Sequence, residues 1–207
     1  MSGLFITFEG IDGSGKSTQV RRLYQHFETL GRKITLTREP GGVPIAEALR
    51  AMLLDPANGG MARATELLLY VAARAQLVAE VIRPALDRGE IVICDRYYDS
   101  TIAYQGAGRG WERASLDALH RVATGNLLPD VTLLLDLDVS ISLARRAPLG
   151  EPDRIEGESY RFYQRVRDGY LEIAKADPGR IVVLDATPDA DAIARRIILQ
   201  LQQCGVI

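Results

Sequence analysis

Five short apolar runs, each followed by a stretch of helical periodicity, constrain the fold of this chain more than any other feature. The runs are rich in Val, Ile, Leu and Phe, which is typical of strands buried on both faces of a parallel sheet. They are Leu4–Glu9, Ile34–Arg38, Ile91–Asp95, Val131–Asp136 and Ile181–Asp185. Repeated strand–helix alternation requires crossover connections that cover the sheet. The sequence therefore predicts an α/β fold with a five-stranded parallel sheet flanked by helices on both faces.

Helical periodicity occupies the segments between these runs. A helix is expected to begin at Pro44, with an apolar stripe of Ile45, Ala48, Leu49, Met52 and Leu53. The pattern over 64–88 is longer, and its Pro84 predicts a kink. The apolar surface of this segment suits either a dimer interface or a long core helix. The other expected helices cover 20–30, 114–124, 139–147, 158–175 and 189–203.

Two segments, 105–113 and 146–157, are too polar and too rich in Gly or Pro for the core. Both are expected to be loops, and loops on a rigid scaffold often carry function. We find no internal repeat, low-complexity tract or linker in the 207 residues. One domain over 1–207 is the economical interpretation.

The composition narrows the functional classes. The 25 Lys and Arg residues against 27 Asp and Glu give a net charge of −2, which disfavours a cationic nucleic-acid clamp. Two cysteines cannot form a disulfide framework or a four-cysteine zinc site, and Cys94 is expected to be a buried core thiol. The longest apolar stretch, 67–82, contains Arg74 and Glu80, and no basic region precedes Glu9 at the start of the chain. We therefore expect a cytoplasmic protein without nucleic-acid or membrane partners.

The segment GIDGSGKS at 10–17 has the spacing G-x-x-x-x-G-K-[ST] and lies between the first strand and the first helix. Glycines in such a loop let backbone amides turn toward phosphate oxygens at a helix N-terminus. Lys16 is expected to reach the β- and γ-phosphates, and Ser17 to ligate Mg²⁺. A dinucleotide-binding turn is the alternative, but the Lys16-Ser17 pair favours the phosphate loop. The expected ATP-binding residues are Gly10, Ile11, Asp12, Gly13, Ser14, Gly15, Lys16, Ser17 and Thr18.

Charged residues follow two further strands at their carboxyl ends, where ligands bind in open parallel sheets. Arg38 ends the second strand, and Asp95 and Arg96 end the third. Arginine recognises phosphate through two parallel hydrogen bonds, which lysine cannot supply. Two arginines beside an ATP site therefore predict a second anionic substrate, such as a nucleoside monophosphate.

Five segments resemble the thymidylate kinase family in order and spacing: FEGIDGSGKSTQ, TREPGG, YVAARAQ, DRYYDSTIAYQGAGRG and DRIE. The resemblance covers essentially the whole chain, and DRYYDSTIAYQG is its most specific part. It implies the phosphate-loop nucleoside monophosphate kinase fold, usually as a homodimer. It also implies Mg²⁺-dependent transfer of the ATP γ-phosphate to dTMP, which gives dTDP and ADP for dTTP synthesis.

The resemblance also implies roles for individual residues. Asp12 would hold the sugar 3′-hydroxyl, while Arg38 and Arg96 would hold the dTMP phosphate. Tyr70 would lie against the thymine ring, and Arg74 would bond a thymine carbonyl. Asp95 would position Mg²⁺ with Ser17. The base and sugar pocket would be lined by Ser100, Thr101, Tyr104 and Gln105.

The acceptor in this reaction is already an anionic oxygen, so no general base is needed. Catalysis would consist of positioning and of charge neutralisation by Lys16, Mg²⁺, Arg96 and an arginine of a lid over 145–156. One family group carries an arginine in the phosphate loop, whereas this chain has Gly13 there and so resembles the bacterial-type group, which supplies a lid arginine. Several members of that group have repeated arginines where this chain has Pro148 and Leu149.

Arg154 is the lid arginine that we expect to act in the transfer, with Arg145 or Arg146 against the adenine. A kinase of another nucleoside monophosphate or of a deoxynucleoside is the nearest alternative, and Arg74 with DRYYDSTIAYQG favours thymine instead. A nucleotide-dependent switch is the alternative from another class. Arg38 and Arg96 are expected to bind the phosphate of a second substrate, which a switch would not need.

Overall fold

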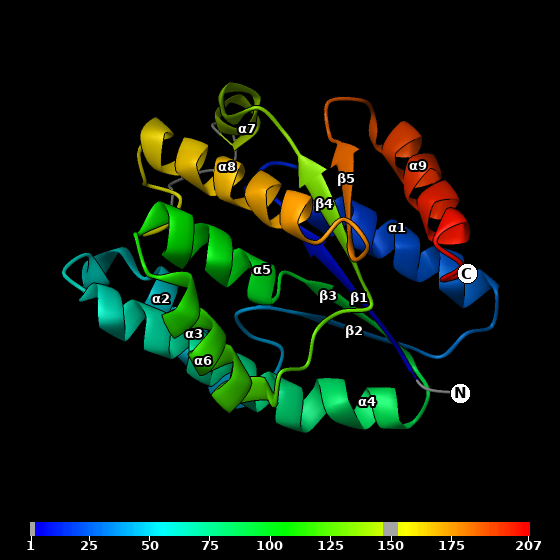
Figure 1. Ribbon diagram of the computed structural model, residues 1–207, viewed down its shortest axis with the longest axis horizontal. Coiled ribbons are helices and arrows are strands. Elements are labelled where there is room, and N and C mark those ends of the chain that lie inside the picture. Colours follow the sequence, from blue (N-terminus) through cyan, green and yellow to red (C-terminus); the bar gives the residue numbers. More distant parts are fainter. Residues whose placement is uncertain (1–2, 147–152) are drawn as a thin grey trace.

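The computed structural model describes residues 3–146 and 153–207. Its centre is a parallel sheet with the strand order β2-β3-β1-β4-β5 (Figure 1). The strands are β1 (Leu4–Glu9), β2 (Ile34–Arg38), β3 (Ile91–Asp95), β4 (Val131–Asp136) and β5 (Ile181–Asp185). All five expected strands are confirmed, including their bounds. Since β1 lies between β3 and β4, the carboxyl ends of these three strands meet at the middle of one sheet edge.

The described residues form helices between and after the strands, as the periodicity predicts. The α-helices are α1 (Lys16–Thr29), α2 (Pro44–Leu54), α3 (Arg63–Leu77), α4 (Arg83–Asp87), α5 (Tyr98–Thr101), α6 (Arg113–Thr124), α7 (Val139–Arg146), α8 (Tyr160–Ala176) and α9 (Ala190–Gln203). Three further segments have other helical geometry: η1 (Pro56–Asn58) is 3₁₀, and η2 (Val78–Ile82) and η3 (Ile102–Gly108) are π-helical. No described helix combines the length and the apolar character that a membrane span requires.

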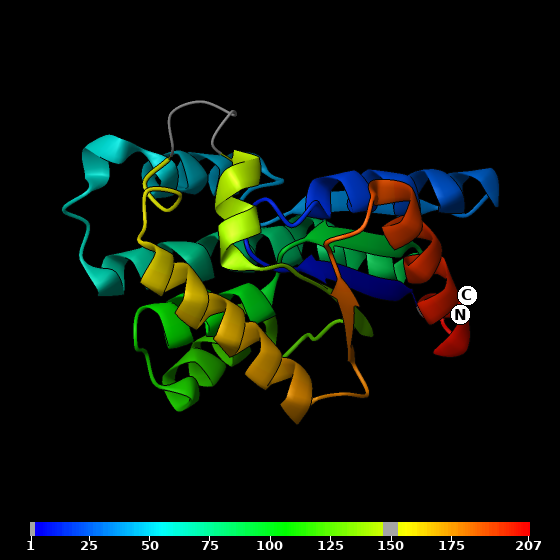
Figure 2. The same ribbon diagram turned by 90° about the horizontal axis from the view of Figure 1, so that it is seen from above.

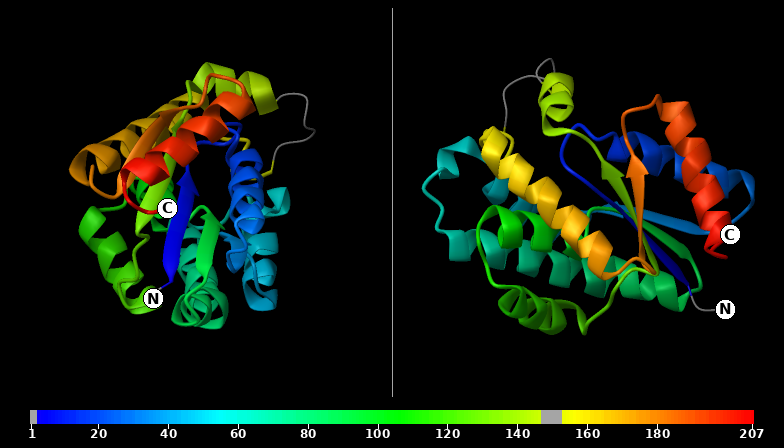
Figure 3. Two further views of the ribbon diagram at one scale, coloured as in Figure 1. Left: turned by 90° about the vertical axis from the view of Figure 1, so that its right-hand side faces the viewer. Right: turned by 45° about the horizontal axis from the view of Figure 1, so that its top comes forward.

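Successive side chains of each strand point to opposite faces of the sheet, so the core has two layers. Ile6 and Phe8 of β1 pack with α1 and α9, whereas Phe5 faces the layer formed by α3, η3 and α8. Figure 3 shows α8 and α9 on opposite sides of β4 and β5. Side chains such as Phe8 and Phe27 are fully buried, and each such burial stabilises the fold by about 1.5–3 kcal/mol. Cys94 is buried in the α3 layer, as expected.

Two expectations are wrong. Residues 105–108 belong to the π-helical segment η3 and do not form a loop, because they pack against α8. On α2 the buried positions are Ala46 and Leu53, whereas Ile45 and Met52 of the expected stripe are about half exposed. Periodicity cannot choose between two apolar faces of one helix, and the packing of α2 against α3 makes that choice.

The segment over 64–88 is helical throughout but not uniform. It consists of α3, the π-helical η2 and α4, and Pro84 lies in the first turn of α4. The π-helical segment ends two residues before this proline and is a local widening of the helix. The helix ends before Gly89, which adopts a positive φ of 74°.

Candidate active site

The phosphate loop follows β1 and leads into α1. Gly10, Gly13 and Gly15 have φ of 132°, 78° and 92°, which side chains disfavour. A Cβ atom at Gly10 would lie 2.5 Å from the Leu135 carbonyl oxygen, so this position admits only glycine. Ser142 of α7 donates to the Asp12 carbonyl at 2.6 Å and holds the loop from above, where Figure 2 shows α7 between α1 and α8. The resulting backbone cradle suits a chain of phosphates.

Lys16 is buried at the base of this cradle. Its Nζ donates to the Ile11 carbonyl at 2.9 Å. Burial and then the charge of Arg96 lower the pKa of Lys16 to about 8. A bound polyphosphate would supply the anionic partner that this ammonium group requires.

Ser17 and Asp95 meet at the edge of the cradle. The Ser17 hydroxyl donates to Asp95 Oδ2 at 2.8 Å, so two oxygen ligands from α1 and β3 lie side by side. Such a pair fits Mg²⁺, which is commonly bound by one or two protein oxygens, water and substrate phosphates. Among the described residues no larger group of His, Cys, Asp or Glu is arranged to hold a metal.

A cavity lies directly over the phosphate loop, and we call it the phosphate-loop cavity. Its lining includes five cationic side chains: Lys16, Arg38, Arg50, Arg96 and Arg146. Arg38 and Arg50 both donate to the Pro40 carbonyl, at 3.0 and 2.9 Å, although their charges repel. Burial and this repulsion lower the pKa of Arg50. An anion in the cavity would relieve the repulsion.

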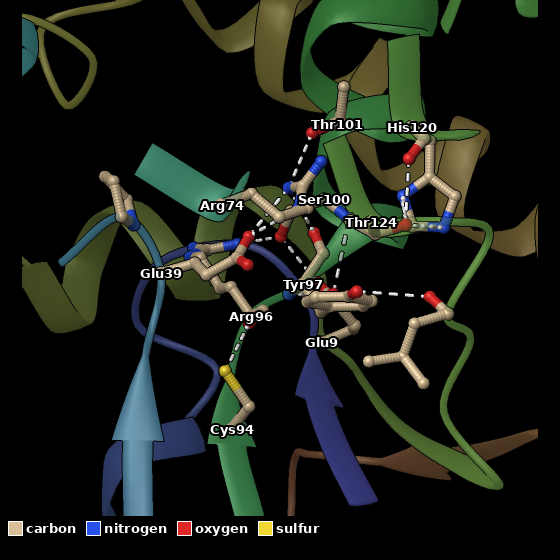
Figure 4. A network of polar contacts seen from close by, with 12 residues as sticks. Glu9, Glu39, Arg74, Cys94, Arg96, Tyr97, Ser100, Thr101, His120 and Thr124 are labelled. Carbon is tan, nitrogen blue, oxygen red and sulfur yellow. Dashed lines mark hydrogen bonds and ion pairs between the residues drawn. The ribbon is translucent and has the colours of Figure 1, made fainter. Parts of the chain in front are cut away.

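Arg96 lies at the centre of the site (Figure 4). Its backbone has a φ of 72°, a left-handed conformation that is uncommon for a residue other than glycine and is often found at functional sites. Its Nη2 pairs with Asp12 Oδ1 at 2.6 Å. Burial raises the pKa of Asp12, but Arg96 and Lys16 outweigh it and hold that pKa well below its usual range. Asp12 is therefore a permanent hydrogen-bond acceptor.

A second cavity, the inner cavity, adjoins the first. The two share the lining residues Asp12, Glu39, Arg50, Arg96 and Glu156. Eight of the nine residues that the sequence assigns to the substrate line the inner cavity: Asp12, Tyr70, Arg74, Arg96, Ser100, Thr101, Tyr104 and Gln105. The ninth, Arg38, lies in the phosphate-loop cavity, where Glu47 binds its guanidinium at 2.9 Å.

Arg74 and Glu39 form a buried ion pair in the wall of the inner cavity (Figure 4). Arg74 Nη2 lies 2.7 Å from Glu39 Oε2, and the two side chains are 3% and 5% exposed. Arg74 also donates to Thr101 Oγ1 at 2.9 Å and to the Tyr97 carbonyl at 3.1 Å. Burial raises the pKa of Glu39, although Arg74 opposes the shift. These contacts hold the guanidinium rigidly at the cavity wall.

Sequence reasoning missed several lining residues. They are Glu39, Pro40, Arg50, Leu54, Tyr97, Asp153, Ile155 and Glu156. Arg50 carried a signal, because it lies four residues after Ala46 and three before Leu53, on the buried face of α2. A charged residue on a buried helix face points to a ligand or an ion pair. The segments TREPGG, DRYYDSTIAYQGAGRG and DRIE contain all the others except Leu54, so the resemblance carried a signal for them as well.

The three arginines of the expected lid occupy different environments. Arg145 donates to the carbonyls of Ala186 and Gly13, at 3.2 and 3.4 Å, beside the loop after β5. Arg146 lies in the phosphate-loop cavity and contacts Tyr163, whose ring centroid is 4.4 Å away. Arg154 does not line this cavity and pairs with buried Glu66 at 2.6 Å. The rest of the expected lid, 147–152 with Pro148 and Leu149, lies outside the described residues.

Comparisons with known proteins agree over nearly the whole chain. A family model described as thymidylate kinase matches residues 8–197. The thymidylate kinase of Syntrophotalea carbinolica is 51% identical over 201 residues, which cover 94% of this chain and 93% of that protein. The thymidylate kinase of Deinococcus radiodurans is 49% identical over 203 residues, with 98% of each chain covered. A crystal structure of thymidylate kinase from Ehrlichia chaffeensis has a TM-score of 0.81 and 35% identity, and the match covers 98% of this chain and 100% of that one.

Proposed function

The chain belongs to the thymidylate kinase family, which phosphorylates dTMP to dTDP with ATP, and we propose how its two cavities divide these substrates. The phosphate-loop cavity holds the phosphates of ATP, and the inner cavity holds dTMP. The observation that carries this proposal is the shared wall: Asp12, Arg50 and Arg96 line both cavities. The dTMP phosphate would therefore lie beside the γ-phosphate, as direct transfer requires.

The inner cavity offers each part of dTMP a matching group. Arg74, held by Glu39, donates to a thymine carbonyl, and Tyr70 lies against the ring. Asp12 accepts from the sugar 3′-hydroxyl, since its low pKa keeps it ionised. The dTMP phosphate lies among guanidinium groups, with Arg50 added to the expected Arg38 and Arg96. Further lining comes from Ser100, Thr101, Tyr104 and Gln105.

The transfer needs no general base, because the attacking phosphate oxygen is already anionic. Lys16 and Arg96 neutralise the charge that spreads over the transferred group. For the lid arginine we propose Arg146 in place of Arg154, because Arg146 lines the phosphate-loop cavity whereas Glu66 holds Arg154 elsewhere. Arg145, at the loop after β5, remains the candidate for contact with the adenine. Mg²⁺ would be held by Ser17 and Asp95 and would neutralise phosphate charge.

We further propose a cytoplasmic homodimer in which 1–207 form one kinase domain with a lid over 145–156. Apolar side chains on the outer surfaces of two packed helices support the dimer: Ile45 and Met52 of α2 and Leu68 of α3 are each more than half exposed. Light scattering after size exclusion tests this assembly. A Met52→Glu variant should shift the protein toward the monomer, and a monomeric wild type would refute the proposal.

The decisive experiment measures ADP release from Mg-ATP with dTMP, dUMP, dCMP, AMP, GMP, UMP and thymidine as separate acceptors, and without acceptor. Strong dependence on dTMP is expected. Turnover with another acceptor would overturn the roles of Arg74 and Tyr70. ADP release at the same rate with every acceptor and without any would favour a nucleotide-dependent switch.

A further inference from the structure

Glu9 is a fully buried carboxylate at the carboxyl end of β1, directly before the phosphate loop. It lines neither the inner cavity nor the phosphate-loop cavity. A buried carboxylate is expensive unless hydrogen bonds or opposite charge satisfy it. The contacts of Glu9 therefore show what this carboxylate does for the site.

One oxygen of Glu9 binds the backbone that follows Arg96 (Figure 4). Glu9 Oε1 accepts from the Tyr97 amide at 2.7 Å and from the Ser100 amide at 3.3 Å. The Arg96 amide itself donates to the Phe8 carbonyl at 2.9 Å. The end of β1 thus holds the backbone on both sides of the left-handed conformation at Arg96. Hydrogen bonds of this kind offset the strain of that conformation.

The other oxygen of Glu9 binds the hydroxyl groups that contact the Arg96 side chain. Ser100 Oγ and Tyr170 OH donate to Glu9 Oε2 at 2.5 and 2.8 Å. Both hydroxyl oxygens in turn accept from Arg96 Nη1, each at 3.1 Å. The ionised carboxylate attracts both hydroxyl protons, so each hydroxyl presents a lone pair to the guanidinium.

We propose that Glu9 is the positioning residue that orients Arg96 toward the dTMP phosphate, and that it does so only as an ionised carboxylate. The inference rests on the proposed role of Arg96 in holding that phosphate. Glu9 acts through Tyr97, Ser100 and Tyr170 and touches no substrate. Tyr170 comes from α8, so the network also connects the helix after the lid to Arg96.

A neutral group of the same shape cannot replace this carboxylate. If a glutamine at position 9 places its NH₂ group toward Ser100 and Tyr170, one hydroxyl can donate to the other, 2.7 Å away, but the second proton must turn toward Arg96, which has only donors. If it places its NH₂ group toward Tyr97, two N–H groups face each other. Either orientation breaks hydrogen bonds that fix Arg96.

Protonation of Glu9 has the same consequence as this substitution. Burial and, next, the charge of Asp99 raise the pKa of Glu9 to about 7, although Arg96 opposes the shift. The network therefore weakens as the pH falls through 7. The charged or titratable groups that face Glu9 are Asp99, Arg96, Lys16, Arg74, Cys94 and Tyr170.

The test compares wild type, Glu9→Gln, Tyr170→Phe and the double variant in steady-state kinetics with dTMP and ATP. Glu9→Gln should raise KM for dTMP about tenfold or more, since a hydrogen-bonded charge is lost. KM for ATP serves as the internal control and should change less than about twofold, because general disorder of the phosphate loop would raise it too. Tyr170→Phe should also raise KM for dTMP. In the double variant the free-energy effect on KM for dTMP should be smaller than the sum of the two single effects, because both residues belong to one network.

The pH profile separates positioning from a structural role. The ratio of wild-type to Glu9→Gln kcat/KM for dTMP should be constant above pH 8 and should fall toward one below pH 6, because titration of dTMP itself cancels in the ratio. A ratio independent of pH, an unchanged KM for dTMP in Glu9→Gln, or additive effects in the double variant would each overturn the proposal. The wild-type protein in the same assay tests the proposed function by itself. If it shows no dTMP-dependent ADP release, the assigned role of Arg96 is wrong, and the inference about Glu9 is wrong with it.

Discussion

The buried ion pair between Arg74 and Glu39 allows a stability prediction that follows directly from the geometry. Replacement of Arg74 by Met keeps an apolar stem of similar length and removes the charge. Glu39 then stays in an environment where it is 5% exposed, and the guanidinium 2.7 Å away is gone. The substitution therefore leaves a buried carboxylate without its counter-ion.

The expected loss is large. Removal of one partner from a buried pair costs about 3–5 kcal/mol, whereas replacement of both partners by neutral groups is often close to neutral. For a chain of this size, each kcal/mol lowers Tm by about 2–4 °C, so Arg74→Met should lower Tm by about 6–20 °C. A double variant that also carries Glu39→Gln should recover much of this loss.

The loss should depend on pH with a defined sign. Burial already raises the pKa of Glu39 above its ordinary value of 4.5, and Arg74 opposes that rise. Without Arg74 the folded-state pKa rises further, so the folded variant binds a proton that the unfolded chain releases above pH 4.5. Stability of Arg74→Met then decreases as the pH rises through the folded-state pKa. The difference from wild type should be smallest near pH 5 and largest near pH 8.

Thermal unfolding from pH 5 to 8 tests this reasoning. Lys175→Met is the control, since it breaks an ion pair with Glu172 in which both side chains are 72% exposed, and it should change Tm little. A Tm loss below about 3 °C for Arg74→Met at pH 8, or the same loss at pH 5 and pH 8, would refute the argument.

Four further predictions concern catalysis. Arg146→Ala should lower kcat at least tenfold more than Arg154→Ala in ADP-release assays, and the reverse order would restore Arg154 as the transfer arginine. Because the pKa of Lys16 is about 8, kcat/KM for ATP should fall above that pH, and a flat profile to pH 9.5 would contradict the assigned environment. Arg50→Ala should raise KM for dTMP more than Arg38→Ala, since Glu47 already binds Arg38; equal effects would argue against this ranking. The thymine methyl is worth about 1–3 kcal/mol, so dUMP should be used about 5–150-fold less efficiently than dTMP, and equal efficiency would contradict the apolar pocket.

Local sequence signals predicted the scaffold well. β1, β3 and β4 are buried on both faces, and the edge strands β2 and β5 are partly exposed. Each of the five is nevertheless a short apolar run whose ends are set by polar or glycine residues. The phosphate loop is likewise local, because its glycines, Lys16 and Ser17 act within eight residues of chain. Eight of nine expected substrate residues line the inner cavity, since the resemblance preserved both their spacing and their order.

Structural features that depend on contacts between distant segments could not be predicted from the sequence. On α2 two apolar faces compete, and only the packing against α3 shows that Ala46 is buried while Met52 is exposed. Residues 105–108 have a loop-like composition but form a π-helical turn against α8. Arg154 and Arg146 both fall in the expected lid segment, and only the folded structure distinguishes their environments: Arg146 lines the phosphate-loop cavity, whereas Arg154 pairs with Glu66.

The sequence by itself determined the sheet, the phosphate loop and the family, because periodicity and short motifs are properties of neighbouring residues. The tertiary structure decided which charges meet: Arg96 with Asp12, Arg74 with Glu39, and Arg154 with Glu66. It also placed Ser100 and Tyr170 between Glu9 and Arg96. The physical reason is that Coulomb and hydrogen-bond energies depend on distances of a few ångströms and on burial. These quantities are set only when residues from β1, β3, α3 and α8 come together in the folded chain.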